Sequence, residues 1–292
     1  MRLILPMPGA EALAAEIAAG LPAELATVET RRFPDGESYV RLPPEVAGRD
    51  VVIICSLARP DDQFLRLMFA ARAARELGAT RLTLVAPYLA YMRQDKRFLP
   101  GEALTSRHFA DLASREFDAL ITVDPHLHRH KALSEIYSIP ATALHAAPLL
   151  ADWIRLNVER PLIIGPDVES EQWVSRVAER AAAPHLVLSK QRHGDRDVEI
   201  AIPDLEAWRD RQPVLIDDIV SSGRTMIETA EGLVARGLAK PVCVAVHALF
   251  ADDAYQRLAE RARSVISTNA VSHPSNGISI APLLVEALQQ VV

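Results

Sequence analysis

The sequence is poor in cysteine and has no long apolar run. Its 292 residues include two cysteines, Cys55 and Cys243, which are too few for a disulfide-rich scaffold or a four-cysteine zinc site. Each cysteine lies in a short apolar run, so we expect two buried core thiols. No apolar run approaches the roughly 18 residues that a membrane-spanning helix needs, so we expect a cytoplasmic protein with no membrane partner.

The chain also has no excess of basic residues. Its formal net charge is −6, and only four of its basic residues are lysine. A mildly acidic chain is not suited to general nucleic-acid binding, although it can carry a local basic site for an anionic substrate. We therefore expect no nucleic-acid partner. The hydrophobic fraction of 49% is ample for a packed core and excludes disorder as the dominant state.

Short apolar runs alternate along the chain with longer segments rich in Ala, Leu, Arg and Glu. Strands that are apolar throughout and alternate with helices predict parallel sheets covered on both faces. The series occurs twice, which predicts two α/β domains covering residues 1–143 and 144–292. We expect strands at 50–56, 81–86, 119–123, 161–165, 185–189, 197–202, 213–216, 241–247 and 264–267, and helices at 61–77, 105–115, 169–182, 223–236, 252–262 and 281–290.

The most informative segment follows the strand expected at 213–216. Two acidic residues, Asp217 and Asp218, end this strand, and the turn Ser221-Ser222-Gly223-Arg224-Thr225 leads into the helix expected at 223–236. Free N–H groups, hydroxyls and the positive end of the helix suit a phosphate, which glycine lets the backbone approach closely. The two carboxylates suit sugar hydroxyls or a metal ion, so the segment predicts a phosphorylated sugar as ligand. The alternative is an ordinary capped helix.

Five further polar motifs lie where the expected strands end or turn. They are Phe33-Pro34-Asp35-Gly36-Glu37, Tyr91-Met92-Arg93-Gln94-Asp95, Val123-Asp124-Pro125-His126, Pro166-Asp167 and Lys190-Gln191-Arg192. Ligands of parallel sheets bind beyond the carboxyl ends of the strands, so most of these motifs lie where ligands bind. The cations and amide of the second motif suit a polyphosphate and a base edge. Taken alone, the first motif is equally consistent with a hairpin turn and the second with a solvated loop.

Taken together and in this order, the motifs resemble those of the ribose-phosphate pyrophosphokinase (PRPP synthase) family along nearly the whole chain. The Asp-Asp segment alone is similar to the 5-phosphoribosyl 1-diphosphate (PRPP) motif of type I phosphoribosyltransferases, which are single-domain and lack the other five motifs. The resemblance implies two type I phosphoribosyltransferase-like α/β domains. It implies transfer of the β,γ-diphosphoryl group of ATP to the 1-hydroxyl of ribose 5-phosphate, with Mg²⁺ as cofactor, in a homodimer or larger homo-oligomer.

The resemblance also implies roles for the motif residues. ATP would be held by Phe33, Asp35, Gly36, Glu37, Arg93, Gln94 and Asp95. The Mg²⁺-linked positions would be His126 and Asp167. Lys190 and Arg192 would be the catalytic cations of a mobile loop, with Arg192 also near the sugar. Ribose 5-phosphate would be bound by Asp217, Asp218, Ser221, Ser222, Gly223, Arg224 and Thr225.

The sequence departs from the family's usual pattern in the phosphate loop. Ser221 and Ser222 stand where most relatives have Asp-Thr, and Arg224 replaces a small residue. We expect the extra guanidinium to strengthen phosphate binding by its charge, although it also makes the loop more crowded.

A second departure concerns regulation. The segment after Arg97 is short and lacks the basic stretch with which many bacterial relatives bind phosphate and ADP as regulators. We therefore expect ADP to inhibit purely in competition with ATP, and phosphate not to activate. Initial rates over a matrix of ADP and ATP concentrations check this, and sigmoidal inhibition by ADP would contradict it.

Three other interpretations stay open. The run from His126 to His130 is a weak candidate for zinc, since no cysteine or acid lies at ligand spacing and Arg129 interrupts the histidines. A phosphoribosyltransferase that consumes PRPP would not need the ATP-binding motifs. A non-catalytic regulatory relative would keep the fold and lose catalytic positions, yet this sequence retains Lys190, Arg192, His126, Asp167 and Asp217.

Overall fold

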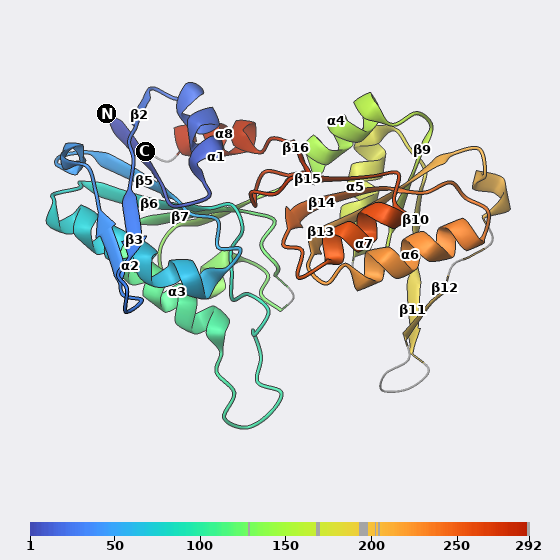
Figure 1. Cartoon of the computed structure of the whole chain (residues 1–292), viewed down its shortest axis with the longest axis horizontal. Helices are drawn as coiled ribbons and strands as arrows, with labels where there is room; N and C mark the ends of the chain where they lie inside the picture. Colours follow the sequence, from blue (N-terminus) through green and yellow to red (C-terminus); the bar gives the residue numbers. More distant parts are fainter. Residues whose placement is uncertain (128, 168–169, 193–197, 202, 204, 291–292) are drawn as a thin grey trace. The chain divides into compact units, whose positions relative to one another are not determined.

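The computed structural model describes the chain except for residues 128, 168–169, 193–197, 202, 204 and 291–292. It forms two compact units, each an α/β unit with helices flanking a six-stranded parallel sheet (Figure 1). Unit 1 contains Met1–His145, Ala270–Ser272 and the last helix, whereas unit 2 contains Ala146–Asn269 and His273–Ile280. Two α/β domains were predicted, and this fold class is confirmed.

Unit 1 is built on a sheet with strand order β2-β1-β5-β6-β7-β8. Its four central strands are buried over nearly their whole length because almost all of their residues are apolar, whereas the two edge strands are largely half-buried. The strands are β1 (Arg2–Pro6), β2 (Ala23–Leu25), β5 (Asp50–Ile54), β6 (Arg81–Ala86), β7 (Ala119–Val123) and β8 (Ala141–Leu144), and a separate hairpin contains β3 (Glu29–Arg32) and β4 (Ser38–Arg41). The helices are α1 (Glu11–Ala19), α2 (Pro60–Glu76), α3 (Thr105–Glu116) and α8 (Ala281–Gln290), with short 3-10 turns at Pro44–Val46 and Leu133–Glu135.

Unit 2 repeats this plan with strand order β10-β9-β13-β14-β15-β16. The strands are β9 (Pro161–Gly165), β10 (His185–Val187), β13 (Gln212–Val220), β14 (Val242–Ala248), β15 (Ser264–Thr268) and β16 (Asn276–Ile278), and a separate two-stranded ribbon contains β11 (Ser189–Arg192) and β12 (Val198–Ala201). The helices are α4 (Ala147–Asn157), α5 (Glu171–Ala181), α6 (Arg224–Ala235) and α7 (Ala254–Arg261), with a 3-10 turn at Glu206–Trp208. Within the part of the chain that the structure describes, every helix is too short or too polar to cross a bilayer.

Strand β13 is longer than the predicted strand 213–216. It continues through both acids to Val220, because its pairing with β14 continues, with Asp217 opposite Ala245 and Val220 opposite Ala248. The carboxylates therefore lie on a regular strand of the central sheet. The backbone hydrogen bonds between β13 and β14 hold these two residues, so their positions are fixed more firmly than they would be in a loop.

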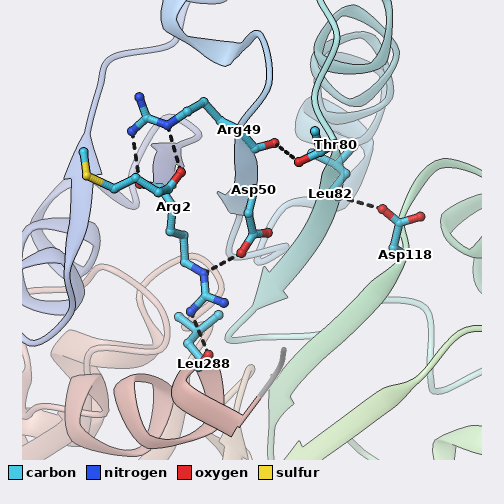
Figure 2. Close-up of polar contacts among 8 residues, drawn as sticks. Arg2, Arg49, Asp50, Thr80, Leu82, Asp118 and Leu288 are labelled. Carbon is cyan, nitrogen blue, oxygen red and sulfur yellow. Dashed lines mark hydrogen bonds and ion pairs between the residues drawn. The ribbon is translucent and has the colours of Figure 1, made fainter.

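Helix α8 packs in unit 1, whereas the prediction placed residues 281–290 in the second domain. Its Leu284 and Leu288 are fully buried, and Gly20 makes room for it, since a Cβ atom there would lie 2.8 Å from Val285 Cγ2. Figure 2 shows how Arg2 fastens its end: Nε donates to Asp50 Oδ2 at 2.9 Å, and Nη1 donates to the Leu288 carbonyl at 2.7 Å. The chain passes from unit 1 to unit 2 after His145, and the predicted boundary was between residues 143 and 144.

Replacing Arg2 by methionine is expected to lower the free energy of unfolding by about 1–2 kcal/mol, because a carboxylate loses its ion pair and a helix-end carbonyl loses its donor. Urea unfolding checks the change. Arg155→Met is the control, since Arg155 lies on an exposed face and stands 3.8 Å from Asp152. An Arg2 variant as stable as the Arg155 variant would show that the contact does not hold α8 in place.

Both thiols are buried, as predicted. Burial raises the pKa of Cys55 to about 12 and the pKa of Cys243 to about 12. At pH 8 almost no thiolate forms, and a reagent also has no access to the sulfur atoms. We expect an aromatic disulfide reagent to label neither cysteine in the native protein and both in denaturant, and rapid native labelling would contradict this.

Candidate active site

The two acids of β13 lie close to each other and to a third carboxylate. The Asp218 N–H donates to Asp217 Oδ1 at 3.0 Å. Burial raises the pKa of the Asp217 carboxyl well above its ordinary value, and the negative charges of Asp218 and Asp167 raise it further. Strands β9 and β13 are neighbours, which explains why Asp167 acts on Asp217. The sequence motifs were separated by 50 residues, and the sheet brings their carboxylates to one edge.

Asp167 is held at the start of helix α5. The Ser170 N–H donates to Asp167 Oδ1 at 3.2 Å, and the Ser170 hydroxyl donates to the Asp167 carbonyl at 2.6 Å. The helix approaches strand β9 closely at Gly165, where a Cβ atom would lie 2.5 Å from Ser170 Oγ and 2.6 Å from Val174 Cγ2. A glycine is therefore required at position 165, because a side chain there would clash with Ser170, the residue that is hydrogen-bonded to Asp167.

Gly165→Ala is expected to lower the free energy of unfolding by about 2 kcal/mol, because the new methyl group overpacks a tight helix–strand contact. Urea unfolding measures this loss. Val174→Ala removes one of the two clashing atoms, so the double variant should be more stable than the sum of the single effects predicts. Simple additivity, or a Gly165 variant of full stability, would contradict the argument.

The predicted phosphate loop joins β13 to α6. Gly223 is the N-cap residue of α6 and has a φ of +66°, a left-handed conformation that favours glycine. Because glycine has no side chain to cap the first turn, it leaves that function to other groups, and a helix N-terminus of this kind attracts anions. Ala251 N donates to Ser221 O at 3.0 Å, so the loop backbone is also held by the segment after β14.

Arg224 lies on the first turn of α6 and is strongly exposed. Its Nε donates to Glu228 Oε1 at 2.6 Å, along the surface of the same helix. The guanidinium charge is thus partly offset by a neighbouring carboxylate. Its contribution to phosphate binding stays a prediction, as do the roles of Ser221, Ser222 and Thr225.

The first motif of unit 1 forms the turn of the β3–β4 hairpin, which was the structural alternative. Phe33 N donates to Glu37 O at 2.8 Å, Gly36 has a φ of +93°, and Asp35 Oδ1 accepts from Glu37 N at 3.2 Å. The Arg31 guanidinium lies 4.4 Å from the centre of the Phe33 ring. A hairpin turn and an ATP contact are compatible, and the ATP-binding role of these residues stays a prediction.

The second motif of unit 1 lies in the connection from β6 to α3. Arg93 is exposed, and the Gln94 carbonyl accepts from Ser106 Oγ at 3.2 Å. The Asp95 side chain is only 2% exposed and pairs with Arg129 at 2.7 Å, and its role in binding ATP stays a prediction. The pair ties this connection to the segment after β7, so Asp95 orients the loop in addition to any contact with ATP.

The third motif ends strand β7. Asp124 has a φ of +38°, unusual for a residue with a side chain, and its carboxylate lies 3.0 Å from His145 Nδ1. The backbone is thus turned sharply two residues before His126, which is half-buried. Among the described residues, no three His, Cys, Asp or Glu side chains are grouped to hold a metal ion, and His128 lies outside them. Nothing here supports the zinc interpretation.

Lys190 and Arg192 lie on strand β11. Their backbone pairs with β12, with Lys190 opposite Ile200 and Arg192 opposite Val198. Residues 193–197, which follow Arg192, lie outside the described residues. Three positioning features had escaped the prediction: Arg129, Gly165 and the segment after β14. Sequence spacing gives no signal for Arg129, and a glycine at the end of a strand gives only a weak signal for Gly165.

Comparison with known proteins extends over both units. Residues 3–115 match the N-terminal domain of ribose phosphate pyrophosphokinase, and residues 132–280 match the phosphoribosyl transferase domain. The ribose-phosphate pyrophosphokinase of Methanopyrus kandleri is 38% identical over 281 residues, covering 95% of each chain, and that of Methanobrevibacter smithii is 33% identical over 291 residues, covering 95% of this chain and 96% of the relative. The crystal structure of the Mycobacterium smegmatis phosphoribosylpyrophosphate synthetase is similar with a TM-score of 0.85 and 25% identity, covering 99% of this chain and 98% of that one.

The fold and the Asp-Asp motif thus define an enzyme built from two type I phosphoribosyltransferase-like domains. The chain belongs to the ribose-phosphate pyrophosphokinase family. The family prediction from the six motifs is confirmed. Single-domain phosphoribosyltransferases do not account for a similarity that covers both units.

Proposed function

We propose that the protein transfers the β,γ-diphosphoryl group of ATP to the 1-hydroxyl of ribose 5-phosphate, giving PRPP and AMP. The observation that carries this proposal is the group formed by Asp167, Asp217 and Asp218 at the end of two neighbouring strands, immediately before the glycine-capped start of α6. A phosphorylated sugar can use both the carboxylates and the start of α6. Its hydroxyls donate to carboxylates, and its phosphate accepts from backbone N–H groups.

In this proposal the 5-phosphate binds to the loop from Ser221 to Thr225. The positive end of the α6 macrodipole and the N–H groups of the first turn attract the dianion. The ribose hydroxyls lie toward Asp217 and Asp218, which precede this loop on strand β13. Burial, and then the neighbouring negative charges, raise the pKa of the Asp217 carboxyl, so a hydroxyl donor or cation at this carboxylate stabilises its charged form.

The residues fit Mg²⁺ as the cofactor. Mg²⁺ prefers oxygen ligands and commonly binds through one or two carboxylates together with water and substrate phosphates. Asp217, with Asp218 and Asp167 close enough to act on its pKa, supplies such carboxylate oxygens. The described residues hold no group of three His, Cys, Asp or Glu that could bind the ion alone, so water and substrate phosphates would complete its coordination. Asp167 and His126 are the proposed Mg²⁺-linked residues. When bound, Mg²⁺ would neutralise charge on the diphosphoryl group.

The reaction requires positioning and charge neutralisation more than covalent catalysis. The 1-hydroxyl oxygen forms a bond to the β-phosphorus of ATP, the bond between that phosphorus and the oxygen bridging to the α-phosphate breaks, and the hydroxyl proton is released. AMP leaves with the bridging oxygen. Lys190 and Arg192 are the proposed cations for the transferring group, and Phe33, Asp35, Gly36, Glu37, Arg93, Gln94 and Asp95 are proposed to serve the ATP site, Asp95 by orienting its loop.

One assay tests the proposal. Purified protein is incubated with ATP, Mg²⁺ and ribose 5-phosphate, and AMP and PRPP are measured together. We expect the two products to appear in equal amounts. Release of ADP in place of AMP would overturn the reaction, pyrophosphate release dependent on a nucleobase and PRPP would indicate a phosphoribosyltransferase, and no turnover would indicate the non-catalytic relative.

We also infer a homodimer or larger homo-oligomer in the cytoplasm. The inference on assembly comes from the family, whose ATP site usually draws on two subunits. Light scattering during size-exclusion chromatography measures the mass in solution, and a monomer of 32.0 kDa that is fully active would contradict it.

A further inference from the structure

The segment that joins β14 to α7 lies against the proposed phosphate loop. Ala251 N donates to Ser221 O at 3.0 Å. A Cβ atom built on Gly223 would lie 3.6 Å from Ala254 Cβ and 3.7 Å from the Ala254 carbonyl oxygen. The segment from Leu249 to Ala254 therefore contacts the loop at its first residue and at the glycine that begins α6.

Three aromatic rings hold this segment in place. The Phe250 ring, directly before Ala251, has its centre 4.8 Å from the His273 imidazole and 5.3 Å from the Tyr255 ring. The rings of Tyr255 and His273 are 4.7 Å apart and nearly perpendicular, at 81°. These spacings are typical of attractive aromatic pairs. Phe250 is thus fixed between a residue of α7 and a residue of the loop before β16.

The imidazole of His273 is itself fixed by a chain of hydrogen bonds. Ser275 N donates to His273 Nδ1 at 3.2 Å, so this nitrogen is an acceptor. Ser275 Oγ lies 2.7 Å from Nδ1 and 2.8 Å from Ser267 Oγ, and Asn276 Nδ2 donates to Ser267 Oγ at 2.9 Å. Donation from amide to hydroxyl to hydroxyl to Nδ1 gives each of these atoms a partner and holds the Nδ1 edge of the ring toward Ser275.

We propose that Phe250, Tyr255 and His273 form a positioning cluster that sets the affinity of the protein for the phosphate group of its sugar substrate. The cluster acts through the Ala251 bond to Ser221 and need not contact the ligand. Backbone N–H groups bind a dianion well only when they are held in a fixed arrangement, since ordering them on binding costs affinity. The proposal deepens the proposed function, and it assigns specificity for a phosphate monoester to residues outside the binding loop.

Phe250→Ala removes the central ring of the cluster. We expect KM for ribose 5-phosphate to rise roughly tenfold, with KM for ATP and kcat within about twofold of wild type, because only the phosphate loop loses its support. Phe250→Tyr keeps the ring and should stay within about twofold of wild type for both substrates. Leu156→Ala is the control, since this residue is exposed on α4 of the same unit.

Calorimetric titration with inorganic phosphate provides a readout that needs no turnover. If Phe250→Ala binds phosphate roughly tenfold more weakly than wild type, the role of the cluster is supported. That result holds even if ribose 5-phosphate is not a substrate, which would contradict only the proposed function. If Phe250→Ala does not fold, Phe250→Leu keeps apolar volume without ring stacking and should weaken binding in the same direction. Unchanged phosphate binding and KM, or an equal loss for ATP and ribose 5-phosphate, would overturn the proposal.

Discussion

Asp217→Asn is expected to lower kcat/KM on the order of 10³-fold while leaving the protein at least as stable as wild type. Activity falls because an uncharged amide cannot attract a cation or accept strongly from a sugar hydroxyl. Stability does not fall, because Asp217 is crowded by the charges of Asp218 and Asp167 and asparagine has nearly the same shape. A loss of activity with a gain of stability is characteristic of a residue kept for function.

The pH dependence of stability has a definite sign. The pKa of Asp217 is raised in the folded state, so its protonated form is favoured by folding. This contribution is fully present below the ordinary Asp value of 3.8 and is lost as pH rises through the raised pKa. Without Mg²⁺, wild type should therefore lose stability relative to Asp217→Asn as pH rises from 4 toward neutral, which urea midpoints measure at each pH.

The control for this experiment is Asp210→Asn. Asp210 is exposed and pairs with Arg160 on the surface of unit 2, so neither activity nor the pH profile should change appreciably. If Asp217→Asn kept full activity, the assignment of Asp217 to the active site would be wrong. A severe loss of its stability would show that the charge is needed by the fold.

Lys190→Ala is expected to lower kcat on the order of 10³-fold with no change in the urea midpoint of the protein. A cation that neutralises charge developing during diphosphoryl transfer acts in the transition state and contributes little to the folded ground state. The backbone of β11 pairs with β12 in a ribbon separate from the six-stranded sheet, so the substitution lies outside the sheet on which unit 2 is built.

Gln191→Ala is the matched control for Lys190→Ala, because it changes the adjacent residue of the same strand without removing charge. We expect the control to keep wild-type kcat within about threefold, and Lys190→Arg to recover part of the lost rate by restoring the charge. If Lys190→Ala turned over at wild-type speed, the assignment of the catalytic cation would be wrong.

Much of the fold could be predicted because its strands are buried on both faces. Segments such as 81–86 and 119–123 are then apolar at most positions, and this signal is local. Helix α1 gave no such signal, because an alanine-rich stretch has little contrast between its faces. The extension of β13 through Asp217 and Asp218 was missed for the opposite reason: charged residues end an apolar pattern, although pairing with β14 continues.

The site was predictable where its chemistry is local in sequence. The acids of β13 and the glycine of the α6 start lie within seven residues, so one motif shows them together. The Asp95–Arg129 pair spans 34 residues, and the contact of Phe250 with His273 spans 23. Such partners meet only because particular strands are neighbours, and composition or spacing does not reveal which strands these are.

The return of α8 to unit 1 makes that unit discontinuous in the sequence. A ribosome that has completed residues 1–145 has not yet made the segment that packs beside Gly20 and receives the Arg2 side chain. During synthesis unit 1 must therefore wait, with part of its apolar surface uncovered, until almost the whole polypeptide has emerged. No single cut between the units would release two complete domains.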